Sequence, residues 1–328
     1  MAGFVRAGHD VRVLARTPSK LAIALGPLGV DADRVEIVEG DVTSPEDVRR
    51  LLDGADACLH AAAVVATRRA DMAAAEATNL TAARSVLRAA VDGGCDPVVH
   101  VSSVSAVFPS PTGVLSADGP VTHPASIYGI TKADCELFAR ELQADGAPVV
   151  IVYPGGIAGP HDAGLNATAA GIARFLRLGG LPMTSGGMLM VDVRDLALVH
   201  LHALEPGHGP RRYMAGGRYL AWPEVLDILR GVTGRRLRGV RVPGTVLRGV
   251  GRVGDLAARW LHADPALDYE SAYFMTGLQP SDDRAVATEL GVSWRPARQT
   301  FGDLLDWLVD AGHLEPRHAG RRAVLSPT

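Results

Sequence analysis

The chain has 328 residues, of which 47% are hydrophobic, and a formal net charge of -3 at pH 7. A chain of this length can bury a large core and can form one large α/β domain with an appendage, or two domains. Its nearly balanced charge gives no electrostatic footprint for nucleic acid or for an anionic membrane, so we expect neither as a partner.

The cysteines and the hydropathy pattern indicate the compartment. Cys58, Cys95 and Cys135 are odd in number and tens of residues apart, which fits neither a disulfide framework nor a metal site. No apolar run approaches the roughly 20 residues that span a bilayer, and the first residues do not resemble a signal peptide. We therefore expect a cytoplasmic protein without a structural metal.

Short β-branched runs alternate with longer helical patterns, which predicts βα units and a parallel sheet. The expected strands are Val11–Leu14, Val35–Val38, Ala57–His60, Val98–Val101 and Val149–Tyr153. The residues from Phe108 to Pro124 include four prolines and two glycines without periodicity, which indicates a loop that could cover a site.

The helices between these strands have recognisable starts and apolar faces. Ser44 followed by Pro45 and two acids has the pattern of a helix N-terminus. Asp192 and Asp195 precede another apolar pattern and are expected to cap a helix. Further helices are expected at Leu80–Ala90, Ile130–Leu142, Leu196–Leu204, Trp222–Leu229 and Phe301–Leu308.

Three residues have the spacing that carbonyl reduction requires. Tyr128 and Lys132 stand one helical turn apart, and Ser103 follows an expected strand 25 residues upstream. Hydride arrival leaves negative charge on a carbonyl oxygen, so a proton donor and a hydrogen-bonding partner must meet there. A neighbouring ammonium lowers the pKa of a tyrosine from about 10 by favouring the phenolate. Lys20 is the only other lysine in the chain.

Each of these residues has an alternative interpretation. The tyrosine and lysine could be an exposed pair on a solvated helix face, and Ser102 or Ser105 could replace Ser103. His200 and His202 are two residues apart on an expected helix and face different ways, which argues against a metal pair.

Around this spacing, the chain resembles the extended short-chain dehydrogenases/reductases, the NAD-dependent epimerase/dehydratase superfamily, and within it the dihydroflavonol reductase and 3β-hydroxysteroid dehydrogenase branch. The segments that carry the resemblance are Glu39–Val42, His60–Ala63, Thr78–Leu80 and Tyr153–Pro160, besides the tyrosine and lysine. The resemblance extends from residue 1 to about residue 312. It implies a Rossmann-like, doubly wound parallel sheet with a smaller C-terminal α/β substrate lobe.

The resemblance also implies domain boundaries. Residues 1–160 would form the dinucleotide-binding domain, and residues 161–312 mainly the substrate lobe, with some segments returning to the sheet. Residues 313–328, rich in arginine and proline, are expected to be a disordered tail.

Roles for further residues follow from the resemblance alone. Asn79 would complete a proton relay with Ser103, Tyr128 and Lys132. The positions that would contact the cofactor, besides Tyr128 and Lys132, are Asp41, Val42, Ala61, Ala62, Ala63, Pro154, Gly155 and Ile157. His123 and His161 lie in expected loops nearby and are weaker candidates for contacts with substrate.

These assignments also have simpler alternatives. Asp41 could be a turn residue, Asn79 a polar helix residue, and the alanine run a place of close packing. Arg16 follows the first expected strand, where NAD-specific relatives place an acid, and could pair with a 2′-phosphate. That pairing would favour NADP(H), with NAD(H) as the alternative cofactor. A solvated surface arginine is the competing interpretation.

The start of the chain departs from the family pattern. Residues 1–10 read as the end of a helix, and no Gly-x-Gly-x-x-Gly or Gly-x-x-Gly-x-x-Gly occurs in the first thirty residues. The first strand and glycine turn of the family, about 15 to 20 residues, are missing. We expect this to open two strand edges inside the sheet and to weaken cofactor binding, and we expect a true start further upstream.

The function that the sequence favours is an NAD(P)-dependent oxidoreductase that interconverts a ketone and a secondary alcohol on an apolar substrate, with cyclic substrates among the options. A nucleotide-sugar epimerase or dehydratase is the first alternative, and a non-catalytic relative that senses NAD(P) or binds a protein is the second. A homodimer is expected by analogy with relatives.

Overall fold

The computed structural model describes residues 1–63, 69–122, 127–162, 164–261 and 267–320. The strands are β1 (Val11–Ala15), β2 (Val35–Glu39), β3 (Cys58–His60), β4 (Val98–Val101), β5 (Val149–Pro154), β6 (Gly156–Ala158), β7 (Gly180–Met183), β8 (Gly187–Asp192), β9 (Arg211–Ala215), β10 (Arg218–Ala221) and β11 (Arg238–Arg241). The α-helices are α1 (Ala2–Arg6), α2 (Ser19–Leu25), α3 (Pro45–Leu52), α4 (Arg69–Asp92), α5 (Ile127–Ala144), α6 (Ala167–Leu178), α7 (Val193–Ala203), α8 (Trp222–Thr233), α9 (Gly244–Leu261), α10 (Tyr269–Gly277), α11 (Arg284–Glu289), α12 (Ala297–Asp310) and α13 (Pro316–Ala319). Short 3₁₀ turns are η1 (Gly26–Leu28), η2 (Ala32–Arg34) and η3 (Val104–Ala106).

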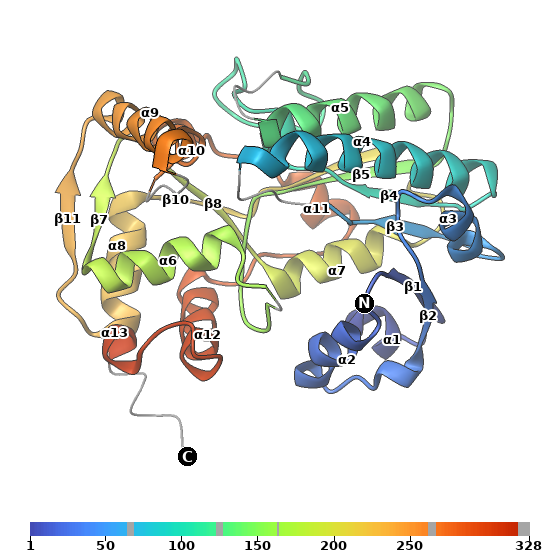
Figure 1. The fold of residues 1–328 in the computed structure, drawn as a ribbon, viewed down its shortest axis with the longest axis horizontal. Coiled ribbons are helices and arrows are strands. Elements are labelled where there is room, and N and C mark those ends of the chain that lie inside the picture. The colour runs from blue at the N-terminus through green and yellow to red at the C-terminus, as the bar shows by residue number, and fades with distance from the viewer. Residues whose placement is uncertain (64–68, 123–126, 163, 262–266, 321–328) are drawn as a thin grey trace.

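Four parallel strands in the order β3-β4-β5-β9 form the main sheet. Their side chains alternate between two apolar layers because successive residues of a strand point to opposite faces. Val98 and Ile151 pack toward α3, α4 and α5, whereas Val99 and Val152 pack toward α7 and α11. Figure 1 shows α4 and α5 on one side of this sheet and α7 on the other. The fold is α/β and Rossmann-like, as the sequence predicts.

A second, two-stranded parallel sheet holds β1 and β2. Within the described residues it is not hydrogen-bonded to the main sheet, so β1 and β3 are both edge strands. The sequence predicts these two open edges, because the family's first strand would lie between them. The small sheet has its own core, to which Val5, Leu21 and Leu25 of α1 and α2 contribute.

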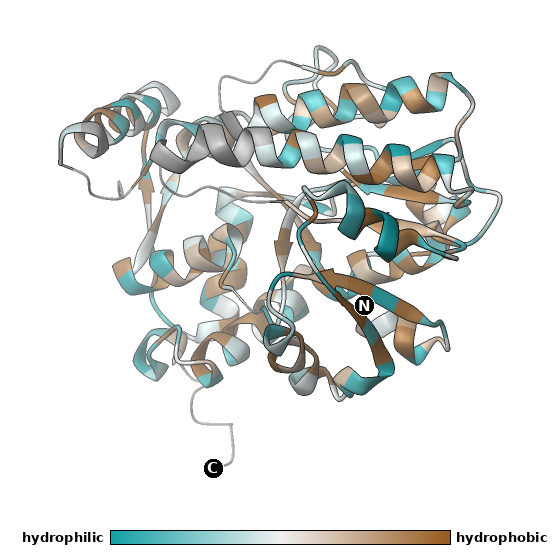
Figure 2. Cartoon of the chain, turned by 45° about the vertical axis from the view of Figure 1, so that its right-hand side comes forward, coloured by the Kyte–Doolittle hydropathy of each residue, from teal (hydrophilic) through white to brown (hydrophobic). Residues whose placement is uncertain are grey.

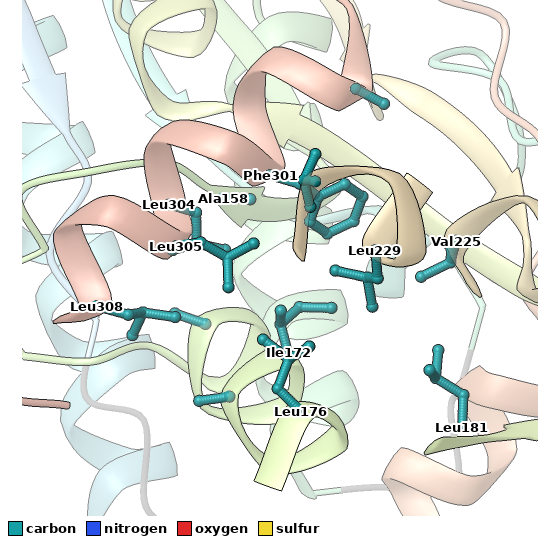
Figure 3. Packing of buried hydrophobic residues seen from close by; sticks show 14 of the residues in the cluster. Ala158, Ile172, Leu176, Leu181, Val225, Leu229, Phe301, Leu304, Leu305 and Leu308 are labelled. Carbon is teal, nitrogen blue, oxygen red and sulfur yellow. The ribbon is translucent and has the colours of Figure 1, made fainter. Parts of the chain in front are cut away.

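The second lobe has its own apolar core between α6, α8 and α12 (Figure 3). Ile172, Leu229 and Phe301, one from each helix, are almost inaccessible to solvent. Two small sheets, β10-β8-β6 and β11-β7, complete the lobe. In Figure 2 the strands of the sheets are mostly apolar, whereas the helices carry both polar and apolar residues.

Two segments within the range expected for the second lobe belong to the main sheet. Strand β9 is its last strand, and α7 covers one of its faces through Leu196 and Val199. The family resemblance implies returning segments of this kind.

The expected helix starts are present. The Ser44 side chain accepts the Asp47 N–H at 3.3 Å and caps α3, with Pro45 at the first helical position. The Asp192 side chain accepts the Arg194 N–H at 2.9 Å and caps α7, which supports a structural role for this aspartate.

The end of the chain differs from the expectation of disorder from residue 313. Leu314 is buried, Pro316–Ala319 form α13, and Ala319 packs into the core of the second lobe. The expectation was wrong for residues 313–320, because composition does not reveal that two apolar side chains dock on a distant core. Residues 321–328 lie outside the described part of the chain.

Candidate active site

Ser103 lies just beyond the carboxyl end of β4. The ladder with β5 continues to Ser102, whose N–H donates to Val152 O at 2.9 Å, and Ser103 then caps η3. The Ser103 hydroxyl oxygen accepts the Ser105 N–H at 3.2 Å. A hydroxyl that accepts in this way still has its own O–H to donate. Ser103 is therefore fixed in orientation and able to donate to a substrate oxygen.

The competing serines lie deeper in the protein. Ser102 and Ser105 are 3% and 2% exposed, whereas Ser103 is partly exposed. Their hydroxyl oxygens are buried and have no hydrogen-bond partner within the described residues. Of the three, Ser103 is the one that a bound molecule can reach.

Lys132 connects α5 to the end of β4. Its Nζ donates to Val101 O at 3.2 Å, two residues before Ser103. Burial lowers the pKa of Lys132, while Cys135 and Glu136 act in the opposite direction. The contact holds the ammonium beside the strand end where Ser103 projects.

Tyr128 belongs to the first turn of α5, four residues before Lys132. Its side chain lies outside the described part of the structure, so its distance from Lys132 and Ser103 stays a prediction. Residues four apart on a helix share one face, which favours the expected pairing.

A buried polar network fixes α5 one turn beyond Lys132. Glu136 is fully buried and accepts from Arg140 Nε at 2.7 Å and from the Tyr153 hydroxyl. Arg140 also donates to Gly119 O at 2.9 Å, in the loop expected over the site. Burial raises the pKa of Tyr153 well above its usual range, so this tyrosine does not compete as a proton donor.

Asn79 lies on α4 where this helix packs against α5. It is 7% exposed, and its backbone oxygen accepts a weak hydrogen bond from Cys135 Sγ at 3.8 Å. Cys135 is three residues after Lys132. Asn79 therefore lies where α4 contacts the helix that carries Lys132.

Two histidines that the sequence analysis did not assign to the site lie close to Lys132. The rings of His60 and His100, on neighbouring positions of β3 and β4, are stacked with centroids 5.8 Å apart and planes 13° apart. Burial lowers the pKa of His60 to about 4, and the charge of Lys132 contributes. Burial lowers the pKa of His100 well below its usual value, and His60 and Lys132 contribute. The sequence feature that could have predicted this pair is a histidine within each of two otherwise apolar strands.

Arg16 and Asp41 lie at the carboxyl ends of β1 and β2. The Asp41 carboxylate accepts from Thr43 Oγ1 at 2.7 Å and from Thr43 N at 2.8 Å. These hydrogen bonds lower the pKa of Asp41, and the charge of Arg16 adds to the effect. Asp41 therefore closes a turn, and Arg16 is an exposed cation close to it.

The other expected cofactor positions fall into two groups. Ala61, Ala62 and Ala63 follow β3 and are exposed, whereas Val42 is partly buried against the main core. The exposed run leaves room at the strand end for another molecule.

The segment after β5 is packed against other backbone. Pro154 ends β5, Ile157 lies in β6, and the Gly155 N–H donates to Ala215 O at 3.1 Å. A Cβ on Gly155 would lie 2.2 Å from Gly216 O, so only glycine fits here. Strand packing alone accounts for this glycine.

The remaining candidates are not drawn together. His161 is exposed with a left-handed φ of 63°, and His123 lies outside the described residues. Among described residues, no group of three or more metal-ligating side chains occurs. No described helix is long and apolar enough to cross a membrane.

The residues expected at the two ends of the cofactor lie at the carboxyl ends of strands in two different sheets. Ser103 and Lys132 lie at the carboxyl end of β4 in the main sheet, and Arg16 lies at the carboxyl end of β1 in the small sheet. In open α/β sheets, ligands bind outside the carboxyl ends of the strands. The described chain has no glycine turn there to receive a pyrophosphate.

These observations define an α/β protein with a serine and a lysine at the end of a central strand. The chain belongs to the NAD dependent epimerase/dehydratase family, whose model matches residues 2–216.

Several relatives match nearly the whole chain, among them the following two. Sterol demethylase protein B of Methylococcus capsulatus is 27% identical over 319 residues, 95% of each chain. A putative dihydroflavonol 4-reductase of Synechocystis is 25% identical over 315 residues, 94% of this chain and 90% of the relative. Among solved structures, the dTDP-glucose 4,6-dehydratase DesIV of Streptomyces venezuelae, with NAD and TYD bound, has a TM-score of 0.70 at 24% identity, covering 96% of this chain and 95% of that one.

Proposed function

We propose that this protein is an NADP(H)-preferring oxidoreductase that interconverts a ketone and a secondary alcohol on an apolar substrate. Tyr128 is the acid/base, Lys132 lowers the pKa of its phenol and binds a ribose hydroxyl, Ser103 orients the carbonyl, and Asn79 belongs to the proton relay. The observation that carries the proposal is the 3.2 Å contact from Lys132 Nζ to Val101 O, which fixes α5 at the strand end where Ser103 projects.

The chemistry assigned to these residues is proton transfer and stabilisation of charge on oxygen. A bound nicotinamide would supply or accept the hydride. The Ser103 hydroxyl donates to the substrate oxygen, and the Tyr128 hydroxyl gives it a proton as negative charge develops. The Lys132 ammonium, held in a desolvated layer, favours the phenolate that remains.

The proposed substrate and cofactor depend on separate observations. Two of the relatives that match nearly the whole chain carry names that refer to fused-ring compounds, a sterol and a dihydroflavonol, which supports an apolar substrate. The preference for NADP(H) is supported by Arg16 at the end of β1, where it can pair with a 2′-phosphate.

Replacing the proposed acid tests this function. Tyr128→Phe removes one hydroxyl, and we expect NADPH-dependent reduction across a panel of ketones to fall about 10² to 10⁴-fold, with cofactor affinity nearly unchanged. Tyr213→Phe is the matched control, because this hydroxyl bonds to Glu289 on the opposite face of the main sheet. Retained turnover in Tyr128→Phe would exclude the assignment.

A nucleotide-sugar dehydratase or epimerase is the second candidate, favoured by the likeness in fold to DesIV. Such enzymes return the hydride to the same substrate molecule, so they need no net consumption of NADPH. Conversion of dTDP-glucose or UDP-glucose to a 4-keto sugar nucleotide by a dehydratase, or to its 4-epimer by an epimerase, without net NADPH oxidation, would favour this candidate over the reductase.

A further inference from the structure

Helix α9 presents an apolar stripe to solvent. Large apolar side chains that are more than half exposed recur along it: Val246 at 53%, Val250 at 53%, Val253 at 66%, Leu256 at 52% and Trp260 at 78%. At about 100° per residue these positions fall within an arc of about 120°. The stripe is therefore continuous along the helix and is not a scatter of single exposed residues.

The opposite side of α9 is already packed. Leu247 is 8% exposed, and a Cβ on Gly251 would lie 2.7 Å from Asp268 O, next to the start of α10. Since α10 occupies that side, α9 cannot turn its stripe inward without losing this packing.

The surroundings of the stripe are strongly basic. Residues 235–261 contain seven arginines and one aspartate, in a chain whose net charge is -3. Arg236, Arg238 and Arg241 are exposed, and none of them forms an ion pair in the part of the chain that the structure describes. Their charges are available to a partner.

The positive charge adjoins the apolar stripe. All four residues of β11 are exposed, including Val240 between two arginines, and β11 leads directly into α9. On α9 itself, Arg252 lies over the Tyr269 ring at 4.9 Å, about 40° around the helix from Leu256. Figure 1 shows α9 and β11 at the same outer end of the second lobe.

We propose that β11 and α9 together form a docking surface for an anionic lipid bilayer. The apolar stripe enters the boundary between headgroups and acyl chains, the arginines bind lipid phosphates, and the Trp260 indole lies at the interface. Apolar, basic and packed faces on one helix are typical of a helix that lies on a membrane. The charge of the whole chain gave no such expectation, because acidic residues elsewhere offset this local cluster.

The same observations argue against a second copy of the chain on this surface. In a symmetric dimer the same patch meets itself, so the unpaired arginines of one copy would face those of the other. Anionic lipid neutralises them instead.

Vesicle sedimentation tests the proposal independently of turnover. We expect the full chain to bind vesicles that contain phosphatidylglycerol and not vesicles of phosphatidylcholine alone, with binding lost between about 0.1 M and about 0.5 M salt. Emission from Trp260 should shift to the blue on binding, and Trp260→Phe should remove that shift.

Matched variants distinguish a loss of binding caused by changing the α9 stripe from one caused by adding or removing a charge anywhere on the surface. Val253→Asp should lower vesicle binding about tenfold or more, whereas Ile23→Asp, at a site 71% exposed on α2, should not. Arg241→Ser should weaken binding, whereas Arg34→Ser, at an exposed site on η2, should not. The proposal is overturned if the native chain does not bind anionic vesicles, or if Val253→Asp binds them as tightly as the native chain does. A dimer in vesicle-free solution that Val253→Asp disperses would also overturn it.

Discussion

The main sheet and the two-stranded β1–β2 sheet are built from similar β-branched strands but differ in how well they are enclosed. All six residues of β5 are buried, because strands flank it on both sides and helices cover both faces. Every residue of β1 is only partly buried, since one of its edges is open. Enclosure at the edges, more than strand sequence, decides which strand is central.

This difference divides the candidate site. Ser103 and Lys132 depend on the enclosed sheet, where the β4–β5 ladder and the Glu136 network fix their positions. Arg16 and Asp41 depend on the small sheet, which has only its own core. We therefore expect the catalytic end of the site to be rigid and the adenosine end to be easily displaced.

The most direct way to test this comparison is to remove the same side chain from each sheet. Ile151→Ala in β5 should cost about 4 kcal/mol of unfolding free energy, because the site is fully buried and cannot collapse. Ile37→Ala in β2, which is partly buried, should cost about 1 kcal/mol. Urea denaturation measures both, and equal losses would show that the two sheets are equally enclosed.

Lys132→Met tests whether the buried ammonium serves catalysis and, at the same time, lowers the stability of the native state. Burial lowers the pKa of Lys132, which means that the protonated side chain destabilises the native state relative to the unfolded chain. We expect turnover to fall about 10² to 10³-fold while the melting temperature stays the same or rises. Lys20→Met, at the only other lysine, should change neither. A large loss of melting temperature in Lys132→Met would indicate a structural role instead.

The His60–His100 pair should make the enclosed sheet sensitive to acid. The unfolded chain binds a proton at His60 near its ordinary pKa of about 6.5, whereas the native side chain does so only at about 4. Stability should therefore fall as the pH drops between these values, by up to about 3 kcal/mol for His60.

Replacing His60 tests whether this side chain causes the expected loss of stability in acid. His60→Phe should reduce the dependence of the urea midpoint on pH between about 6.5 and about 4, with His100 accounting for part of what remains, and the exposed His161→Phe should leave it unchanged. An unaltered pH dependence in His60→Phe would rule out this histidine as the source.

The smallest expected effect is that of replacing Arg16, which lies at the end of β1 in the small sheet. Arg16→Ala should weaken NADPH binding about tenfold and leave NADH binding unchanged, because only NADPH carries a 2′-phosphate. Arg34→Ala is the control on the same unit. Equal weakening of both cofactors, measured by fluorescence titration, would mean that Arg16 does not contact the phosphate.

Much of the main sheet could be predicted from local patterns. The runs at Val98 and Val149 begin strands where expected, and Ser44 caps its helix, because burial and capping follow directly from residue type. Ser103 was predictable because it follows a strand, and a strand end marks a site.

The features that depend on distant contacts could not be predicted. Stacking of His60 on His100 depends on the β3–β4 register, and the close fit of Gly155 depends on Gly216 far along the chain. The exposed stripe of α9 has the periodicity of a buried one, and only the packing on α10 reveals which side faces solvent.

Transfer of deuterium tests the central claim most directly. With NADPH deuterated at both C4 positions of the nicotinamide and a panel of apolar ketones, we predict an alcohol product that carries one deuterium on the former carbonyl carbon. The yield should be unchanged in Tyr213→Phe and lost in Tyr128→Phe. Product without deuterium, or equal yields from both variants, would contradict reduction at the end of β4.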